Sequence, residues 1–245
     1  MPARFFVDLP LHPGGTIALP DGAARHVQVL RLQPGAALTL FNGGGGEWSA
    51  TVQRMGRSDV VVQVDVHDLV ERELPWRFTL GLGVPANERM DTLVEKATEL
   101  GVYAIQPLQC ERSVLRLKDD RALKKVAHWQ GVAVAASEQS GRTCVPHILP
   151  VLGLVDWLHS LPAVHDAEQR LLLSLRSDAT ALNRSRTLAA VVCLSGPEGG
   201  LADAEEAAAL ARGFQPVSLG ARVLRADTAP LALLAHLALR EAPGA

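Results

Sequence analysis

Hydrophobic and polar residues follow two different patterns along this chain, and the pattern changes near residue 70. Before that point, valines occupy every even-numbered position from 60 to 66, so that one face of the segment is apolar. This period of two predicts a half-buried β-strand. Residues 47–54 precede it across the turn residues 55–58, which predicts a hairpin. Residues 1–70 are therefore expected to form a β-rich domain.

A polar segment, residues 68–76, is expected to link this domain to a second one at residues 76–245. After it, apolar runs that fit strands alternate with segments of helical period. The strands are predicted at residues 78–84, 103–108, 171–175, 191–194 and 214–219. The helices are predicted at residues 90–100, 121–140 and 228–241, together with one that begins with the capping box Asp203-x-x-Glu206 and ends at Gly213.

Strands that alternate with helices predict an α/β domain whose largely parallel sheet is covered by helices on both faces. Such sheets bind ligands beyond the carboxyl ends of their strands. Two glycine-containing loops, residues 194–200 and 219–229, follow predicted strands at this edge and open helices. Glycine has no Cβ atom, so backbone groups there can approach a ligand closely. Two such loops in succession predict a pocket.

Neither loop matches a common nucleotide motif. The glycines at positions 196, 199 and 200 lack the Gly-x-Gly-x-x-Gly spacing of a dinucleotide site, and no Gly-Lys-Ser/Thr follows them. Ordinary strand-to-helix turns are the alternative interpretation. The second loop, however, carries Arg222, Arg225 and Asp227 in otherwise apolar surroundings, which favours a functional site.

Size and composition narrow the class of protein. A chain of 245 residues that is 48% hydrophobic can form one large or two modest domains. The apolar run at residues 230–239 is too short to span a bilayer and residues 1–7 contain no signal segment, so we expect no membrane association and a cytoplasmic location. Cys110, Cys144 and Cys193 form no motif and are expected to be reduced thiols. No metal site is expected, because no His-x-x-x-His pair occurs among the eight histidines.

The net charge of −2 is not typical of an RNA-binding protein. Residues 112–125, however, hold six lysines and arginines against two aspartates, a local charge of +4. This stretch is a candidate phosphate-binding surface, and the alternative is a solvated helix surface. One Tyr, four Trp and five Phe provide little material for base stacking. RNA binding is therefore expected to depend on phosphate contacts and on the shape of a preformed target.

Two strings, Gly-Pro-Glu-Gly-Gly-Leu at 196–201 and Leu-Gly-x-Arg-Val-Leu-Arg-x-Asp-Thr-Ala at 219–229, resemble the C-terminal signature of the SPOUT-class methyltransferases that modify N3 of a uridine in 16S ribosomal RNA. Further strings at residues 4–7, 25–31, 95–102 and 138–142 extend the resemblance over nearly the whole chain. The resemblance implies a PUA-like β-barrel at residues 1–70 and a SPOUT domain with a trefoil knot at residues 76–245. It also implies S-adenosylmethionine as methyl donor, 16S ribosomal RNA as substrate, and a homodimer. Because the chain has few aromatic residues and no net basic charge, we expect the assembled small subunit to be a better substrate than naked RNA.

The methyl donor is expected to bind against residues of both loops and of the strand before them. These are Leu173, Gly196, Glu198, Gly199, Leu219, Gly220, Val223 and Leu224. Methyl transfer to uracil N3 requires stabilisation of a uracil anion, which a guanidinium can provide. Arg225 is the first candidate for this role, Arg222 the second, and Asp227 a further catalytic candidate.

Each of these assignments has a structural alternative. Either arginine can pair with Asp227 and merely order the loop, Asp227 can cap the following helix, and Glu198 can brace its loop. The family usually has glutamate at position 227 and arginine at position 128, where this chain has Asp227 and His128. The residues expected to contact RNA are Arg4, Arg25, Arg31, Arg112, Arg116 and Arg142.

Two other classes of function compete with the methyltransferase. A non-enzymatic RNA-binding protein or ribosome-assembly factor would explain the β-rich domain and the basic stretch, but it leaves the two glycine loops without a purpose. A nucleotide-binding α/β enzyme such as a dehydrogenase would explain the sheet, but the chain lacks the glycine fingerprint of that class.

Overall fold

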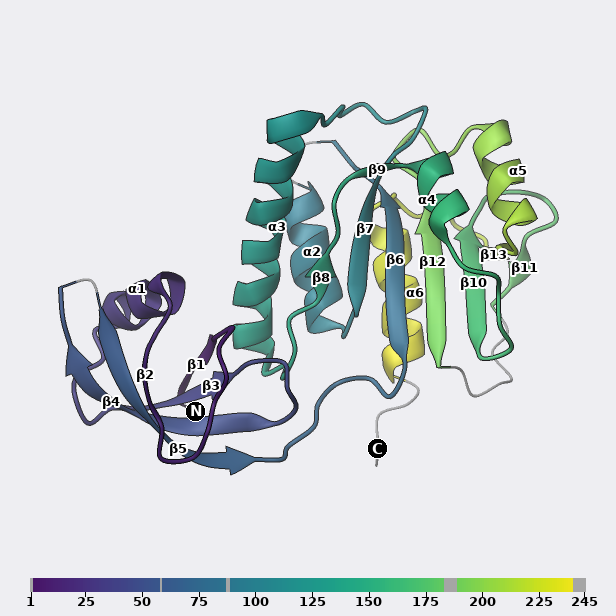
Figure 1. Cartoon of the computed structure of the whole chain (residues 1–245). Helices are drawn as coiled ribbons and strands as arrows, with labels where there is room; N and C mark the ends of the chain where they lie inside the picture. Colours follow the sequence, from purple (N-terminus) through teal and green to yellow (C-terminus); the bar gives the residue numbers. More distant parts are fainter. Residues whose placement is uncertain (1, 58, 87–88, 183–188, 240–245) are drawn as a thin grey trace. The chain divides into compact units, whose positions relative to one another are not determined.

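The structure is a computed structural model that describes residues 2–57, 59–86, 89–182 and 189–239. The chain divides into two compact units (Figure 1). The first unit comprises residues 1–73 and 134–145, and the second comprises residues 74–133 and 146–245.

The first unit contains a five-stranded sheet of order β1-β3-β4-β5-β2, the helix α1 and the end of a longer helix, α3 (Asp119–Ser140), that begins in the second unit. Its elements are β1 (Ala3–Phe6), β2 (Thr16–Ala18), α1 (Asp21–Val29), β3 (Ala37–Phe41), β4 (Glu47–Met55) and β5 (Val60–Asp68). The predicted hairpin is confirmed, because β4 and β5 pair antiparallel. Helix α1 was not predicted. Its buried residues are Ala23, Ala24 and Val27, and three apolar positions within five residues are too short a stretch to show a clear helical period.

One position of the predicted valine pattern differs in the structure. Val60, Val62 and Val64 are fully buried, whereas Val66 is 65% exposed. A register shift between β4 and β5 places an extra residue of β5 opposite Trp48 and its neighbours. Such a bulge reverses which face the following side chains occupy, so Val66 points outward and His67 stacks on Trp48.

The second unit is built on an eight-stranded sheet of order β11-β13-β10-β12-β6-β7-β8, with β9 also paired to β7. The strands are β6 (Arg77–Gly83), β7 (Ala104–Gln109), β8 (His147–Ile148), β9 (Leu152–Gly153), β10 (Glu168–Leu173), β11 (Thr180–Ala181), β12 (Ala190–Ser195) and β13 (Gln215–Ser218). Every strand pair of this sheet is parallel, which confirms the predicted parallel sheet.

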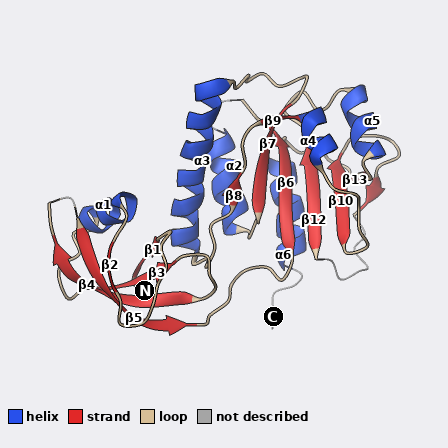
Figure 2. Ribbon diagram, viewed as in Figure 1, coloured by secondary structure: helices blue, strands red, loops and turns tan. Residues whose placement is uncertain are grey.

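Helices cover this sheet on both faces, as predicted (Figure 2). The helices are α2 (Arg89–Glu99), α3 (Asp119–Ser140), whose first part belongs to this unit, α4 (Leu154–Ser160), α5 (Asp203–Ala211) and α6 (Thr228–Leu239). Helix α2 packs on α6 and helix α4 packs on α5. Gly101 has φ +91° just after α2, which is the expected glycine stop. Residues 240 and 241 of the predicted last helix lie outside the described residues.

The predicted capping box at the start of α5 is one residue out of register. Helix α5 begins at Asp203 itself, and the carboxylate of Glu205 accepts a hydrogen bond from the backbone N–H of Ala202 at 2.9 Å. Glu205 therefore fulfils the capping role that was predicted for Glu206. The Glu206 carboxylate instead accepts a hydrogen bond from the hydroxyl of Ser174, which follows β10. The predicted end of this helix at Gly213 is confirmed by a φ of +82°.

The order of strands brings distant segments together. Strand β12 lies between β10 and β6, and β13 lies on the other side of β10. The carboxyl ends of β10, β12 and β13 are therefore neighbours in space. In the sequence, the end of β13 at Ser218 lies 45 positions after the end of β10 at Leu173. The trefoil knot that the family resemblance implies stays a prediction.

Candidate functional site

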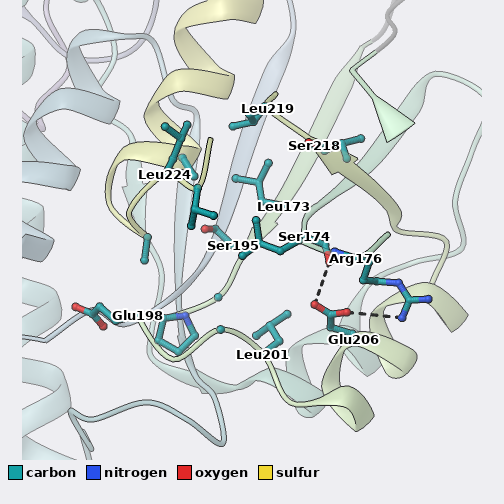
Figure 3. A pocket seen from close by; sticks show the side chains of 18 of the residues that line it. Leu173, Ser174, Arg176, Ser195, Glu198, Leu201, Glu206, Ser218, Leu219 and Leu224 are labelled. Carbon is teal, nitrogen blue, oxygen red and sulfur yellow. Dashed lines mark hydrogen bonds and ion pairs between the residues drawn. The ribbon is translucent and has the colours of Figure 1, made fainter. Parts of the chain in front are cut away.

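A pocket of about 450 Å³ lies in the second unit at the carboxyl ends of β10, β12 and β13 (Figure 3). Its walls are the three loops that follow these strands, the start of α5 and Arg112 from the loop after β7. This is the edge at which parallel sheets bind ligands, and the volume is typical of small-molecule sites. None of the helices that the structure describes is long and apolar enough to cross a membrane.

All eight residues expected to contact the methyl donor line this pocket, namely Leu173, Gly196, Glu198, Gly199, Leu219, Gly220, Val223 and Leu224. Their role as ligands stays a prediction. The wall formed by Ser174, Arg176 and Glu206 was not predicted from the sequence. The signal for it was available in part, because Ser174 directly follows a buried strand that ends at the same edge as the glycine loops.

Two glycines of the first loop, Gly196 and Gly199, lie in close contact with their neighbours. A Cβ atom on Gly196 would lie 3.0 Å from the backbone nitrogen of Leu201, and one on Gly199 would lie 3.0 Å from Cβ of Arg112. Gly220 in the second loop differs, because nothing lies within 4 Å of its Cβ position and its φ is +105°. Backbone conformation therefore selects glycine at position 220, and the space beside it is open to a ligand.

Glu198 makes the bracing contacts that were one of its two predicted roles. Its carboxylate accepts hydrogen bonds from the backbone N–H of Ala86 at 3.0 Å and from the guanidinium of Arg89 at 3.3 Å. These contacts join the first glycine loop to the connection between β6 and α2. Glu198 also lines the pocket, with 29% of its side chain exposed.

The pocket also has a polar wall formed by the loop after β10 and by α5. The Ser174 hydroxyl donates a hydrogen bond to Glu206 at 3.1 Å, and Arg176 lies 3.8 Å from the other carboxylate oxygen (Figure 3). Arg176 in turn pairs with Asp178 at 2.7 Å. Groups of both charge signs therefore lie on this side of the pocket.

The three catalytic candidates lie on the second glycine loop but differ in position. Arg222 lines the pocket, whereas Arg225 and Asp227 are not among its lining residues. The carbonyl oxygen of Arg225 accepts the backbone N–H groups of Thr228 and Ala229 at 3.0 and 2.9 Å and thereby begins α6. Over the residues that the structure describes, Asp227 forms no ion pair with either arginine.

Four of the six residues expected to contact RNA are exposed. Arg25 lies on α1, and Arg31 follows it with an unusual positive φ of +55°. In the second unit, the Arg112 guanidinium donates to the carbonyl oxygen of Gly199 at 3.2 Å, and Arg116 is exposed on the same loop. Arg112 thus belongs to the rim of the pocket, which the sequence did not indicate.

Arg4 and Arg142 instead form ion pairs inside the first unit. Arg142 is 6% exposed and its guanidinium pairs with Glu73, with Nε at 3.0 Å from the carboxylate. Arg4 pairs with Glu47 and donates to the carbonyl oxygen of Arg142 at 2.8 Å. Burial alone would raise the pKa of Glu47, but hydrogen bonds from Arg72 and Arg4 outweigh this effect and hold the pKa below its ordinary value. These contacts hold the end of α3 within the first unit.

Comparisons with known proteins agree with this architecture. A model described as an RNA methyltransferase domain matches residues 72–238, and a model described as an RNA methyltransferase PUA domain matches residues 19–65. The ribosomal RNA small subunit methyltransferase E of Synechocystis is 33% identical over 225 residues, which cover 91% of this chain and 72% of the relative. Its namesake in Bacillus subtilis is 28% identical, with 96% of this chain and 95% of the relative covered.

A solved structure supports the same relationship. The crystal structure of a ribosomal RNA small subunit methyltransferase E from Neisseria gonorrhoeae, bound to S-adenosyl methionine, is similar with a TM-score of 0.89 and 38% identity over 97% of both chains. These matches confirm the predicted fold class, an α/β methyltransferase domain with an N-terminal PUA domain. The exact domain boundaries stay predictions. The chain belongs to the family of RNA methyltransferases that includes the ribosomal RNA small subunit methyltransferase E proteins.

Proposed function

We propose that this protein transfers a methyl group from S-adenosylmethionine to N3 of a uridine in 16S ribosomal RNA of the small subunit. The observation that carries the proposal is the pocket at the carboxyl ends of β10, β12 and β13, which the two glycine loops enclose in a chain of this family. The relatives named as small-subunit methyltransferases support the choice of RNA. The reaction would take place in the cytoplasm.

The residues of the pocket fit such a donor. Leu173, Leu219 and Leu224 offer apolar side chains to the faces of an adenine ring. At Gly220, the open space and the positive φ allow the backbone to approach the ligand. When bound, the donor supplies an electrophilic methyl group on a positively charged sulfur atom.

The loops' chemical task is to align uracil N3 with this methyl group and to exclude water. Uracil N3 carries a proton at neutral pH, and it must lose this proton as the new nitrogen–carbon bond forms and the sulfur–carbon bond breaks. A guanidinium beside a uracil carbonyl oxygen would stabilise the resulting anion, because it is a fixed fork of donors that keeps its charge.

We assign this role to Arg225, with Arg222 as the second candidate. Arg225 is exposed on the loop that encloses the donor pocket without lining it, which suits a group that faces the incoming RNA. Arg222, in contrast, lines the pocket in which the donor is expected to bind. Asp227, half-buried two residues after Arg225, is the remaining catalytic candidate of this loop.

RNA contact is assigned to exposed arginines of both units. Arg25 and Arg31 provide it in the first unit, and Arg112 and Arg116 in the second. Arg4 and Arg142, already engaged with Glu47 and Glu73, position the end of α3 in this proposal. Because the chain has few aromatic residues and a net charge of −2, the assembled small subunit would be a better substrate than unstructured RNA.

We further propose a homodimer formed through the second unit. Helix α6 buries Leu233, Leu234 and Leu237 against its own unit. Leu239 on the same helix is 73% exposed and Leu231 is only partly buried, which leaves apolar surface available to a second copy. Light scattering at micromolar concentration tests this part, and a monomeric mass would contradict it.

Two experiments test the function itself. Calorimetric titration with S-adenosylmethionine, NAD and ATP separates a methyltransferase from a dehydrogenase and from a protein without a nucleotide site; only the first compound should bind. Mass mapping of 16S RNA from cells with and without the gene should then show one methylated uridine that disappears with the gene. An unchanged methylation map would contradict the proposal.

A further inference from the structure

Glu206 places an oriented carboxylate on the pocket wall, with 19% of its side chain exposed. One oxygen accepts the hydrogen bond from Ser174, which is itself held by the backbone N–H of Arg176 at 3.2 Å. Within the part of the chain that the structure describes, the other oxygen accepts no hydrogen bond and lies 3.8 Å from Nη1 of Arg176. The carboxylate is therefore fixed in direction while one oxygen is available to a ligand.

Two parts of the pocket wall differ in character, because leucines form one and a pair of charged side chains forms the other. In Figure 3, Leu219 and Leu224 lie on one side, and Arg176 and Glu206 lie on the opposite side. Asp178 pairs with Nε and Nη2 of Arg176 at 2.7 and 2.9 Å, which leaves Nη1 on the side of Glu206. A ligand that suits both sides has an apolar ring at one end and charges of both signs at the other.

S-adenosylmethionine has this distribution, because the flat faces of its adenine ring are apolar, whereas its amino-acid tail carries an α-ammonium and an α-carboxylate. We propose that Glu206 binds the α-ammonium of the methyl donor, with Nη1 of Arg176 beside it to bind the α-carboxylate. Charge-assisted hydrogen bonds of this kind are stronger than neutral ones. This inference rests on the proposed function, and it gives the pocket a means to select the complete donor over simpler adenine nucleosides.

Glu206→Gln tests the proposal, because it removes the charge but keeps the shape of the side chain and a partner for Ser174. Calorimetry measures binding of three probes: S-adenosylmethionine, its decarboxylated form, which keeps the ammonium, and 5′-methylthioadenosine, which lacks the whole tail. Glu206→Gln should weaken the first two about tenfold, the effect of one charged hydrogen bond, and leave the third within about twofold. Arg176→Gln should weaken binding of S-adenosylmethionine alone among the three probes.

Glu95→Gln is the matched control. Glu95 is an exposed acid of α2 that pairs with Lys96, so the variant removes one negative charge away from the pocket and should bind all three probes as the wild type does. Equal losses for all three probes in Glu206→Gln, no loss for S-adenosylmethionine, or a loss in Glu95→Gln would each overturn the inference. A wild-type protein that binds none of the probes would overturn the proposed function, and the inference with it.

Discussion

Gly83, at the end of β6, lies so close to Pro197 that a Cβ atom at position 83 would be 2.5 Å from the proline Cδ. The strand end thus fixes the position of the first glycine loop, which forms one wall of the pocket. We expect Gly83→Ala to displace this loop and to weaken S-adenosylmethionine binding about tenfold or more, since the contact is with backbone and a ring that cannot turn away.

Gly131 on α3 provides the control for this substitution, because nothing lies within 4 Å of its Cβ position. Gly131→Ala should leave donor binding unchanged and raise stability by about 0.5–1 kcal/mol, the usual gain for alanine inside a helix. Calorimetry and thermal unfolding measure the two effects. Wild-type affinity in Gly83→Ala would show that the loop position is not set by this contact.

Gly220 tests the second loop. With φ +105° and open space around its Cβ position, Gly220→Val should cost on the order of 1–2 kcal/mol in backbone strain and also place a branched side chain where the donor is expected. Donor affinity should therefore fall sharply while the fold survives. Gly14→Val, in the first unit with φ +77° and equally open space, carries comparable strain and should keep wild-type donor affinity. Equal affinities in the two variants would remove Gly220 from the site.

The structure differs from the sequence prediction mainly where residues distant in the chain meet. Strands of the parallel sheet were predicted because each is a continuous apolar run bounded by turn residues. The polar wall of the pocket was not, since Ser174 and Glu206 become neighbours only through the lateral placement of β10 beside β12. Arg142 was assigned to RNA from its place in a motif, but its partner Glu73 lies 69 residues away.

The proposed roles of the two loop arginines can be separated kinetically. Arg225→Lys keeps the positive charge but loses the planar fork, so the single-turnover rate of methyl transfer should fall about a hundredfold or more, with donor and RNA affinities nearly unchanged. Arg222→Lys, at the pocket wall, should affect donor affinity more than the rate. Wild-type turnover in Arg225→Lys would reassign that residue to loop structure.

Cysteine reactivity reports on the core of the second unit. Burial raises the pKa of the Cys110 thiol to about 12, and it also raises the pKa of Cys193. A raised pKa lowers the thiolate fraction at a given pH, to about one in ten thousand for Cys110 at pH 8, and the fraction grows as pH rises. Iodoacetamide at pH 8 should therefore modify the partly exposed Cys144 first, with all three cysteines modified only in denaturant. Rapid modification of native Cys110 would contradict this packing.

RNA binding should weaken as the salt concentration rises, because it is expected to depend on contacts between arginines and phosphates. The logarithm of the affinity for the small subunit should fall linearly with the logarithm of the salt concentration. Each of the variants Arg25→Gln, Arg31→Gln and Arg116→Gln should make this slope less steep by about 0.7–0.9, because each loses one phosphate contact. Lys96→Gln is the control, because Lys96 already pairs with Glu95 and Glu99 on α2, and it should leave the slope unchanged. A slope that none of the arginine variants alters would place the RNA surface elsewhere on the chain. Rapid methylation of a short unstructured oligonucleotide would show, in addition, that a preshaped target is not required.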